Sequence, residues 1–479
     1  MIFYVLGRIM LIEGILMTPS MIVGLIYSER AALAFVPPCL FLIIIGIVSC
    51  FLKPESQSIY ARDGFLTVGL SWIIMSLAGA VPFMLCGEFP SVWDCIFEIV
   101  SGFTTTGASV LPSVEQLPHC ILFWRSFTHW VGGMGVLVFV MAVLPMSSER
   151  SLHLMRAEVP GPVVGKLVPR MKETAKILYC VYGALTVVLF VLLICGGMPV
   201  FDSLCNAFGT AGTGGFAVKN AGIAAYDSAY IEMVIAVFML IFGVNFNLYY
   251  LILIKKVREV FRSEELRCYL IIVAAATAII TLNIFRTCDG AGMAFRQAFF
   301  QVSSIITTTG FATVDFASKW PVLSQTVLLI LMFTGACAGS TGGGFKISRV
   351  MIMFKSFVCE IRKQLHPKAA IIGRMEGRPI SNDLMHSTLV YFAMYAMIIC
   401  VSVFILSFDC YDFTTVFSAE LSCINNIGPG LGAVGPYGNF GGFSALSKMV
   451  LTLNMLLGRL EIFPILILFS PNVWRKNIN

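Results

Sequence analysis

Four short segments rich in glycine and threonine recur along this chain, each after an apolar stretch that is too short to cross a membrane. They read SGFTTTGAS (101–109), FGTAGTGGF (208–216), SIITTTGFAT (304–313) and CINNIGPGLG (423–432). Aligning them on the glycine that follows the Thr or Asn run gives the register Gly107, Gly214, Gly310 and Gly428. Internal repetition of this kind indicates one structural unit that occurs four times.

The chain around these segments is strongly apolar. Of its 479 residues, 58% are hydrophobic and 12% are charged, against roughly 25% charged residues in an ordinary soluble domain. About 20 apolar residues cross the hydrocarbon core of a bilayer, and ten such runs are expected, at about 3–26, 33–52, 64–86, 121–146, 176–197, 229–254, 269–287, 323–350, 387–408 and 447–470. The first run lacks a cleavage site and is expected to be retained. We therefore predict an all-α polytopic membrane protein.

The order of elements predicts the domain organisation. A spanning helix, a short half-helix, a Gly/Thr loop and a second spanning helix form one pore repeat, and the sequence predicts four such repeats around a central axis after an initial pair of helices. The expected divisions are 1–55 for the N-terminal helix pair, 56–150, 151–262 and 263–378 for pore repeats 1 to 3, and 379–479 for pore repeat 4. The second helix of repeat 3 is expected to be broken.

The distribution of Lys and Arg predicts the orientation, because cytoplasmic loops of membrane proteins carry an excess of these residues. Most of them lie in the segments 53–62, 150–176, 255–267, 346–378 and 475–476, whereas the opposite loops hold only Arg30, Lys219, Arg296 and Lys319. Both termini are therefore expected in the cytoplasm, and the four Gly/Thr loops are expected to enter the membrane from outside.

The composition of the four loops indicates an ion pathway. Non-helical backbone is tolerated at membrane depth where it is buried in protein or lines a watery path. Backbone carbonyls and threonine hydroxyls are hard, neutral ligands for a monovalent cation, and a ring of carbonyls can replace its hydration shell. The C-terminal end of each half-helix adds partial negative charge. The alternative is that these segments are ordinary external turns.

Several motifs carry a family resemblance. They are FWRSFTHWVGGMG (123–135), TTTGF (307–311), CAGSTGGGFK (337–346), NNIGPGLG (425–432) and LLGRLEIFP (456–464). In this combination the chain resembles the Trk/Ktr/HKT superfamily of potassium transporters over nearly its whole length. Its two additional N-terminal helices are similar to those of the bacterial TrkH-type members.

The resemblance implies a potassium filter and several partners. The implied filter residues are Thr105, Thr106, Gly107, Thr213, Gly214, Thr308, Thr309, Gly310, Asn426, Ile427 and Gly428. Within the superfamily a serine in the first loop goes with sodium transport, so a glycine there favours potassium. The glycines crowded in the second loop leave its register open by one residue.

The resemblance also implies how the protein is assembled and where it lies. It implies a homodimer with one pore per protomer and a cytoplasmic nucleotide-binding partner of the TrkA type. The implied location is the bacterial inner membrane.

Two features of the later spans are candidate gates. The run 335–344 contains five glycines, each costing about 1 kcal/mol relative to alanine in a helix, and its predicted gate residues are Gly335, Gly339, Ser340, Thr341, Gly342, Gly343 and Gly344. The alternative is close helix packing through small residues. Arg459 lies near the middle of the last span, where a charge needs a partner or a watery cavity. The resemblance implies that Arg459 projects into the pore, whereas a structural ion pair is the alternative.

Other charged residues near the loops have less specific interpretations. Arg125 begins the fourth span, and snorkelling to the interface is the favoured interpretation over a position near the first loop. Glu98 and Glu420 lie in half-helices, where they either raise the local cation concentration or are solvated at the helix ends. The basic segment 346–378 is expected to meet a regulatory protein, the anionic lipid of the inner leaflet, or both. No nucleic-acid partner is expected.

Two other functional classes are alternatives to a potassium pore. An ion-coupled potassium symporter, driven by protons or sodium, also uses internal repeats and broken helices, but usually as two inverted halves. A membrane enzyme would need a cluster of titratable groups at membrane depth. The five histidines form no HExxH motif and the 15 cysteines form no CxxC pair. The sequence therefore favours potassium uptake over catalysis.

Overall fold

The computed structural model describes residues 2–51, 61–135, 171–288, 290–368 and 373–471. These residues are helical apart from connecting loops and one antiparallel hairpin, β1 (Arg374–Met375) with β2 (Arg378–Pro379). Six of the described helices are long and apolar enough to cross a membrane, or seven if one bent pair counts as a span. The predicted class, an all-α multi-pass membrane protein, is confirmed. The number of ten spans stays a prediction.

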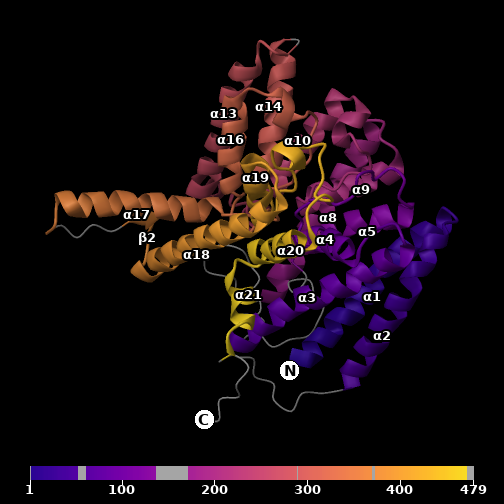
Figure 1. The fold of residues 1–479 in the computed structure, drawn as a ribbon. Coiled ribbons are helices and arrows are strands. Elements are labelled where there is room, and N and C mark those ends of the chain that lie inside the picture. Colours follow the sequence, from indigo (N-terminus) through magenta and orange to yellow (C-terminus); the bar gives the residue numbers. More distant parts are fainter. Residues whose placement is uncertain (1, 52–60, 136–170, 289, 369–372, 472–479) are drawn as a thin grey trace, which may run out of the picture.

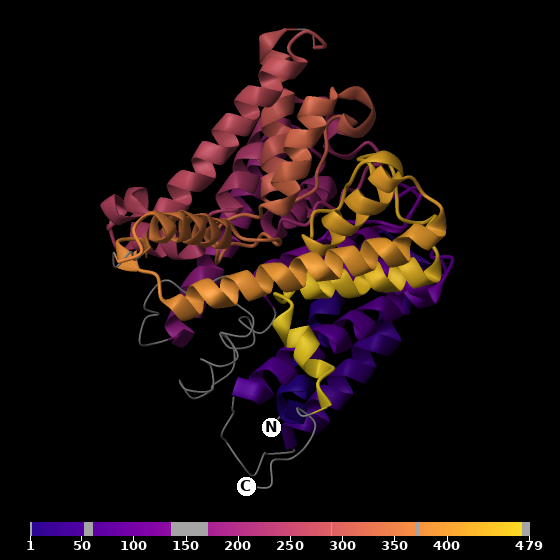
Figure 2. The same ribbon diagram turned by 60° about the vertical axis from the view of Figure 1, so that its left-hand side comes forward.

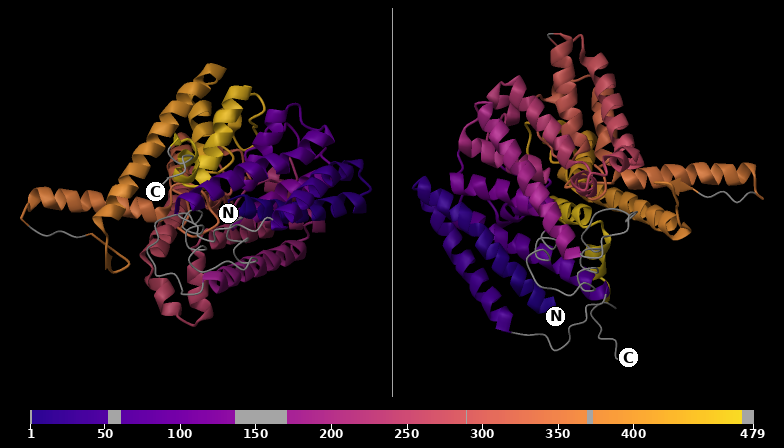
Figure 3. Two further views of the ribbon diagram at one scale, coloured as in Figure 1. Left: turned by 90° about the horizontal axis from the view of Figure 1, so that it is seen from below. Right: turned by 180° about the vertical axis from the view of Figure 1, so that it is seen from behind.

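An N-terminal helix pair flanks the first repeat. α1 (Ile2–Ile26) and α2 (Val36–Phe51) are joined by η1 (Arg30–Phe35) and pack side by side. α1 also packs against the first and last helices of repeat 1 (Figure 1). The beginning of α1 and the end of the last helix, α21, lie on the same side of the molecule (Figures 1 and 3).

Four repeats follow, each with a first helix, a short pore helix and a second helix. Repeat 1 has α3 (Ala61–Cys86), α4 (Val92–Phe103) and α5 (His119–Gly133), and repeat 2 has α8 (Met171–Cys195), α9 (Val200–Gly212) and α10 (Ala229–Phe242) with α11 (Phe246–Leu253). Repeat 3 has α13 (Glu264–Ile284), α14 (Ala291–Ile306) and α16 (Val322–Phe333) with α17 (Ile347–Leu365). Repeat 4 has α18 (Asn382–Leu406), α19 (Phe413–Ile424) and α20 (Ala445–Arg459) with α21 (Phe463–Leu468). Shorter elements are η2 (Gly222–Tyr226), α12 (Val257–Arg262), α15 (Phe316–Lys319), η3 (Ser407–Asp409) and η4 (Gly432–Val434).

The repeats are arranged in a closed cycle. The second helix of each repeat packs against the pore helix of the next, so that α5 contacts α9, α10 contacts α14, α16 contacts α19 and α20 contacts α4. Within repeat 4, α18 and α20 run alongside each other (Figure 2). Each pore helix is therefore enclosed by helices of two repeats. This enclosure buries the last turns of the pore helices, as Val100, Ile305 and Leu421 illustrate.

The second helices of repeats 2, 3 and 4 are each broken into two parts. α10 and α11 meet at an angle of 89°, α16 is separated from α17 by residues 334–346, and α20 is separated from α21 by residues 460–462. The five glycines of 335–344 predicted the break in repeat 3. The breaks inside the predicted spans 229–254 and 447–470 were not predicted, because hydropathy does not register a bend within an apolar segment. Beyond its break, α17 projects away from the rest of the molecule (Figure 1).

The divisions expected between domains are only partly visible. The divisions at 55/56 and 150/151 lie outside the described residues, as do residues 136–146 of the fourth predicted span. The division at 262/263 lies between α12 and α13, and the division at 378/379 falls inside β2. The domain limits stay predictions.

Candidate ion pathway

The four pore helices end in the same backbone turn. A residue in the left-handed conformation follows each helix, namely Thr105 (φ 56°), Thr213 (φ 54°), Thr308 (φ 57°) and Asn426 (φ 56°). The next N–H then donates to the carbonyl five residues earlier, from Thr106 to Ser101, Gly214 to Gly209, Thr309 to Ser304 and Ile427 to Ser422, over 2.8–3.0 Å. This pattern is a Schellman-type C-cap. It gives four loops that can be aligned by conformation.

That alignment changes the predicted register of the second loop. Two residues after each left-handed residue stands a glycine with positive φ, and these are Gly107, Gly215, Gly310 and Gly428. The equivalent glycine of repeat 2 is therefore Gly215, and the sequence alignment on Gly214 was off by one residue. Gly214 instead corresponds to Thr106, Thr309 and Ile427. We call Gly107, Gly215, Gly310 and Gly428 the ring glycines.

The ring glycines touch one another's loops in cyclic order. A Cβ atom built on Gly107 would lie 1.9 Å from the Gly214 carbonyl oxygen, and one on Gly215 would lie 1.9 Å from that of Thr309. A Cβ on Gly310 would lie 2.0 Å from the Ile427 oxygen, and one on Gly428 would lie 2.8 Å from the Thr106 oxygen. Only glycine combines a positive φ with such close approach of backbone. The four contacts close a ring of backbone around one axis.

The side chains of the ring loops are buried but do not repeat fourfold. Thr104 bonds Thr106 through their hydroxyls, and Thr307 bonds Thr309 in the same way, each at 2.8 Å. In the fourth loop Asn426 Nδ2 donates to Thr106 Oγ1 at 3.0 Å and to the Met455 carbonyl at 2.9 Å. The fourfold symmetry therefore lies in the backbone.

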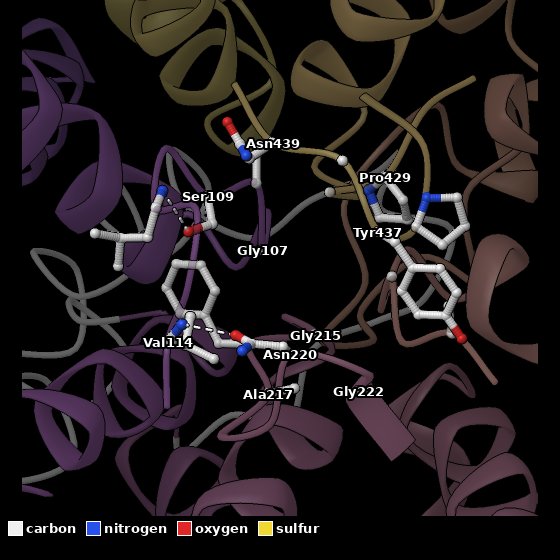
Figure 4. A pocket seen from close by; sticks show the side chains of 18 of the residues that line it. Gly107, Ser109, Val114, Gly215, Ala217, Asn220, Gly222, Pro429, Tyr437 and Asn439 are labelled. Carbon is white, nitrogen blue, oxygen red and sulfur yellow. Dashed lines mark hydrogen bonds between the residues drawn. The ribbon is translucent and has the colours of Figure 1, made fainter. Parts of the chain in front are cut away.

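A cavity of about 170 Å³ opens on one side of the ring. All four ring glycines line it, together with the segments that follow them. Figure 4 shows Gly107, Gly215 and Pro429 from three repeats around a common opening. The lining segments are tied together, since Val114 N donates to Asn220 Oδ1 at 2.8 Å. We call this cavity the vestibule.

On the other side of the ring lies the loop 334–346, which contains the predicted gate glycines. Gly343 N donates to Thr308 Oγ1 at 2.7 Å, which joins this loop to the third ring loop. Cys337 N donates to the Gly243 carbonyl at 3.1 Å, and Phe246 N donates to the Gly339 carbonyl at 3.0 Å. The loop is thus inserted between the ring and the break of α10 and α11.

Two buried charged residues hold this loop, and sequence reasoning did not single out either as a site residue. Glu265 Oε1 accepts a hydrogen bond from Ala338 N at 2.7 Å. Lys346 Nζ donates to the Gly342 carbonyl. Lys346 was counted among the basic residues of the cytoplasmic loops, and only 1% of it is accessible. The sequence signal that could have identified Lys346 was its position two residues after the last glycine of the run 335–344.

Arg459 joins three parts of the pathway. Its Nη2 donates to the carbonyls of Gly132 at 2.5 Å and Gly133 at 2.9 Å, which are the C-terminal carbonyls of α5. Its Nη1 donates to the Thr341 carbonyl at 2.8 Å and to Thr105 Oγ1 at 3.1 Å. A cation is favourable at a helix C-terminus. Arg459 therefore lies below the first ring loop and in direct contact with the 334–346 loop.

The favoured interpretation of Arg125 and both alternatives given for Glu98 were wrong. Arg125 does not snorkel, because it is 2% accessible and pairs with the completely buried Glu98 at 2.6 Å. Glu98 is therefore neither solvated nor free to attract cations. The pairing could not be read from sequence spacing, because the two residues lie on different helices.

The carboxylates of Glu420 and Glu461 also contact residues outside the ring loops. Glu420 is completely buried and accepts from Asn454 Nδ2 at 2.9 and 2.7 Å, so the alternative that it is solvated at a helix end was wrong. Glu461 pairs with Arg349 of α17. The first contact joins α19 to α20 within repeat 4, and the second fastens repeat 4 to α17 of repeat 3.

This geometry defines a class of protein. Four helix–loop–helix repeats, closed in a cycle around glycine loops with a charged side chain beneath them, form a multi-pass membrane protein of the pore-repeat class. The model of the TrkH family, described as "Cation transport protein", matches residues 32–476. The chain belongs to this family, whose members are transport proteins and not enzymes.

Individual relatives agree with this assignment. The chain is 37% identical over 480 residues to the Trk system potassium uptake protein TrkH of Salmonella typhimurium strain LT2, covering 98% of this chain and 97% of the relative. It is 34% identical to the protein of the same name from Halomonas elongata, covering 99% of each. The crystal structure of the potassium transporter TrkH from Vibrio parahaemolyticus matches with a TM-score of 0.89 and 33% identity over 99% of both chains.

Proposed function

We propose that this protein takes up potassium across the cytoplasmic membrane of a bacterium, with the backbone ring as its selectivity filter. The observation that carries the proposal is the cyclic contact of each ring glycine with a carbonyl of the next loop. Carbonyl oxygens held at such a ring can replace the hydration shell of the ion. The potassium ion is the transported substrate. The relatives from Salmonella typhimurium and Halomonas elongata are named potassium uptake proteins, which supports this choice of ion.

The filter residues follow from the corrected register. Carbonyls of Thr106, Gly214, Thr309 and Ile427 precede the ring glycines, and the hydroxyl residues Thr105, Thr213 and Thr308 lie one position earlier, with Asn426 in the fourth loop. The four pore helices direct their C-terminal ends toward this ring, which favours a cation.

The 334–346 loop and Arg459 form the gate in this proposal. The loop contacts the third ring loop through Gly343 and Thr308, and Arg459 binds both the loop and Thr105. A positive charge at this depth repels a cation, and the loop fills space on the same side of the ring. Opening then requires the loop to leave its contacts with Arg459.

Passive permeation is favoured over proton-coupled symport. The ring loops 104–109, 212–217, 307–313 and 425–432 contain no acidic residue. The nearby carboxylates of Glu98 and Glu420 are held by Arg125 and Asn454. A proton-coupled transporter would place a titratable group where the potassium ion passes.

Assembly and orientation complete the proposal. The Lys and Arg distribution places both termini and the 334–346 side of the ring in the cytoplasm, and the vestibule then opens to the outside. The protein acts as a homodimer with one pore per protomer, embedded in lipid. A cytoplasmic nucleotide-binding subunit of the TrkA type binds the cytoplasmic side and controls the gate.

Gly107→Ser tests the filter. The new side chain would begin 1.9 Å from the Gly214 carbonyl oxygen, so the ring must distort and the potassium-to-sodium permeability ratio should fall about tenfold. The measurement is the reversal potential in a planar bilayer with potassium on one side and sodium on the other. Gly183→Ser in α8 is the control, since a Cβ there meets no atom within 4 Å. An unchanged ratio in folded Gly107→Ser would refute the filter assignment.

A further inference from the structure

One charged pair stands directly behind the ring. Glu98 of α4 accepts from Arg125 Nε at 2.8 Å and from Arg125 Nη2 at 2.6 Å. The same carboxylate accepts from Ser109 Oγ at 2.9 Å and from Val110 N at 3.0 Å. Ser109 and Val110 follow the ring glycine Gly107 in the chain. Glu98 therefore ties the far limb of the first ring loop to the second helix of its own repeat.

Arg125 extends this connection to the second ring loop. Its guanidinium carbon lies 4.0 Å from the centre of the Phe216 ring, and Phe216 directly follows the ring glycine Gly215. One helical turn away on α5, His129 bonds the Gly102 carbonyl at 2.7 Å and accepts from Phe216 N at 3.2 Å. α5 thus presents two side chains that join the first and second repeats at the level of the ring.

The pair distinguishes the first repeat from the other three. Glu98 lies nine residues before its ring glycine, and the equivalent positions hold Asn206, Gln301 and Ala419. In repeat 3, Gln301 Nε2 donates to Thr313 Oγ1 at 3.4 Å, which also links a pore helix to the limb after the ring. The link therefore recurs in repeat 3 with neutral groups, and repeat 1 makes it with a buried carboxylate and a cation.

Arg125 also lines the vestibule. A positive charge beside a path for cations is unfavourable unless a counter-charge neutralises it, and Glu98 supplies that counter-charge from a completely buried position. Removing one partner of a buried pair leaves the other uncompensated. The pair therefore has two separable roles, positioning of the ring loops and neutralisation of Arg125.

We propose that Glu98 and Arg125 are positioning residues that clamp the first two ring loops together and thereby determine how well the pore discriminates potassium from sodium. Neither side chain coordinates the ion. The clamp acts through Ser109 and Val110 on one loop and through Phe216 on the next. This inference rests on the filter proposed above, which the same assay tests independently through the wild-type protein.

Glu98→Gln tests the clamp. The amide keeps the shape of the carboxylate but leaves Arg125 without its counter-charge, so we expect the potassium-to-sodium permeability ratio and the unitary potassium conductance each to fall about tenfold. Both are read in single-channel bilayer recordings of the purified full-length protein. Glu232→Gln is the matched control, because it removes a partly buried pair with Arg296 between α10 and α14 (3.0 Å). It should leave both quantities unchanged.

The double variant Glu98→Gln/Arg125→Gln separates the two roles. Conductance should return toward the wild-type value because no charge is left uncompensated, whereas the permeability ratio should stay low because the clamp is still broken. A ratio restored along with the conductance would overturn the positioning role. A folded Glu98→Gln protein with wild-type ratio and conductance would overturn the proposal altogether.

Arg125→Lys covers the case in which Glu98→Gln does not fold. Lysine keeps the charge but lacks the planar fork that donates twice to one carboxylate, so the ratio should fall by about threefold with little change in conductance. An unchanged ratio in this variant would also overturn the proposal. If the wild-type protein itself shows no preference for potassium, the proposed function fails first, and the clamp is refuted with it.

Discussion

Gly214 and Gly215 differ in what an added Cβ atom would meet. At Gly215 a Cβ would meet the Thr309 backbone oxygen at 1.9 Å, whereas at Gly214 it would meet ring atoms of the His129 side chain at 2.3 Å. Backbone of a neighbouring loop cannot be trimmed by mutation, but a side chain can. The corrected register therefore has a direct experimental signature.

We expect Gly215→Ala and Gly214→Ala each to lower the potassium-to-sodium permeability ratio about tenfold. Adding His129→Ala should restore part of the ratio in Gly214→Ala and none of it in Gly215→Ala. Bi-ionic reversal potentials of the four variants give the comparison, with His129→Ala alone as the baseline. Equal rescue of both glycine variants would contradict the register derived from the backbone.

Arg459 gives a second prediction at this scale. A unit charge 4 Å from an ion is worth about 4 kcal/mol at an effective dielectric constant of 20, so its neutralisation should raise potassium flux by about tenfold or more. Arg459→Gln keeps an amide that can donate to Gly132 or Gly133. The measurement is rubidium uptake into liposomes at matched protein content. A flux equal to or below the wild-type value would show that Arg459 is not part of the barrier.

Sequence reasoning located the ring but not the contacts that support it. The Gly/Thr runs and the charge at position 459 stand out in an apolar chain, because each is costly there without a special environment. Glu98 and Arg125 also stand out, yet their pairing depends on how α4 and α5 pack. Gly215 was missed for a different reason, since three glycines within four residues offer several alignments and only the backbone conformation selects one.

At the scale of elements, the 334–346 loop is held from outside the ring. Glu265, at the start of α13, bonds Ala338 N, and Glu376 of the β1–β2 hairpin accepts from Glu264 N at 2.7 Å and Ser263 Oγ at 3.1 Å. A chain of contacts therefore runs from the hairpin through the start of α13 to the loop.

Glu265→Ala should loosen this loop without altering the ring. We expect potassium flux to rise about threefold, since the lost hydrogen bond to a carboxylate is worth roughly 1.5–3 kcal/mol and only part of that opposes opening. Amide hydrogen exchange over residues 335–344 should become faster. Glu264→Ala is the control, because Glu264 pairs with Lys355 and not with the loop. A changed permeability ratio in Glu265→Ala would contradict this division of roles.

The broken helices show what hydropathy can and cannot predict. Glycine density revealed the break in repeat 3, whereas the breaks in repeats 2 and 4 lie within continuous apolar runs. Two weaker signals were present. Asn245 accepts from Asn247 N at 2.9 Å at the start of α11, and Pro464 stands in the first turn of α21. Both residues favour helix starts.

At the scale of the whole molecule, the N-terminal pair supports repeat 1 from outside the cycle. Glu29, between α1 and η1, accepts from His119 N at 2.7 Å and from Cys120 N at 3.1 Å. Those are the first N–H groups of α5, so the Glu29 carboxylate caps the helix that carries Arg125 and His129. Packing of this kind could not be derived from the sequence, because it joins residues about 90 positions apart.

Glu29→Gln should weaken this cap. Partial burial raises the pKa of Glu29, but the hydrogen bonds from His119 and Cys120 outweigh it and leave the pKa below its ordinary value of 4.5. The cap therefore stabilises the protein above that pH, by about 1 kcal/mol, and the stabilisation is lost as the pH falls through the lower folded-state pKa. Melting temperatures in detergent from pH 7 to pH 3 should converge for wild type and Glu29→Gln. A constant difference would contradict the account.

The central claim is that a ring of backbone, and not a titratable group, selects the ion. The most direct measurement is the reversal potential of the purified protein in a planar bilayer with potassium on one side and sodium on the other, repeated with a pH gradient imposed. Our account predicts a reversal close to the potassium equilibrium potential that does not move with the pH gradient. A reversal that follows the proton gradient would contradict it and indicate coupled transport.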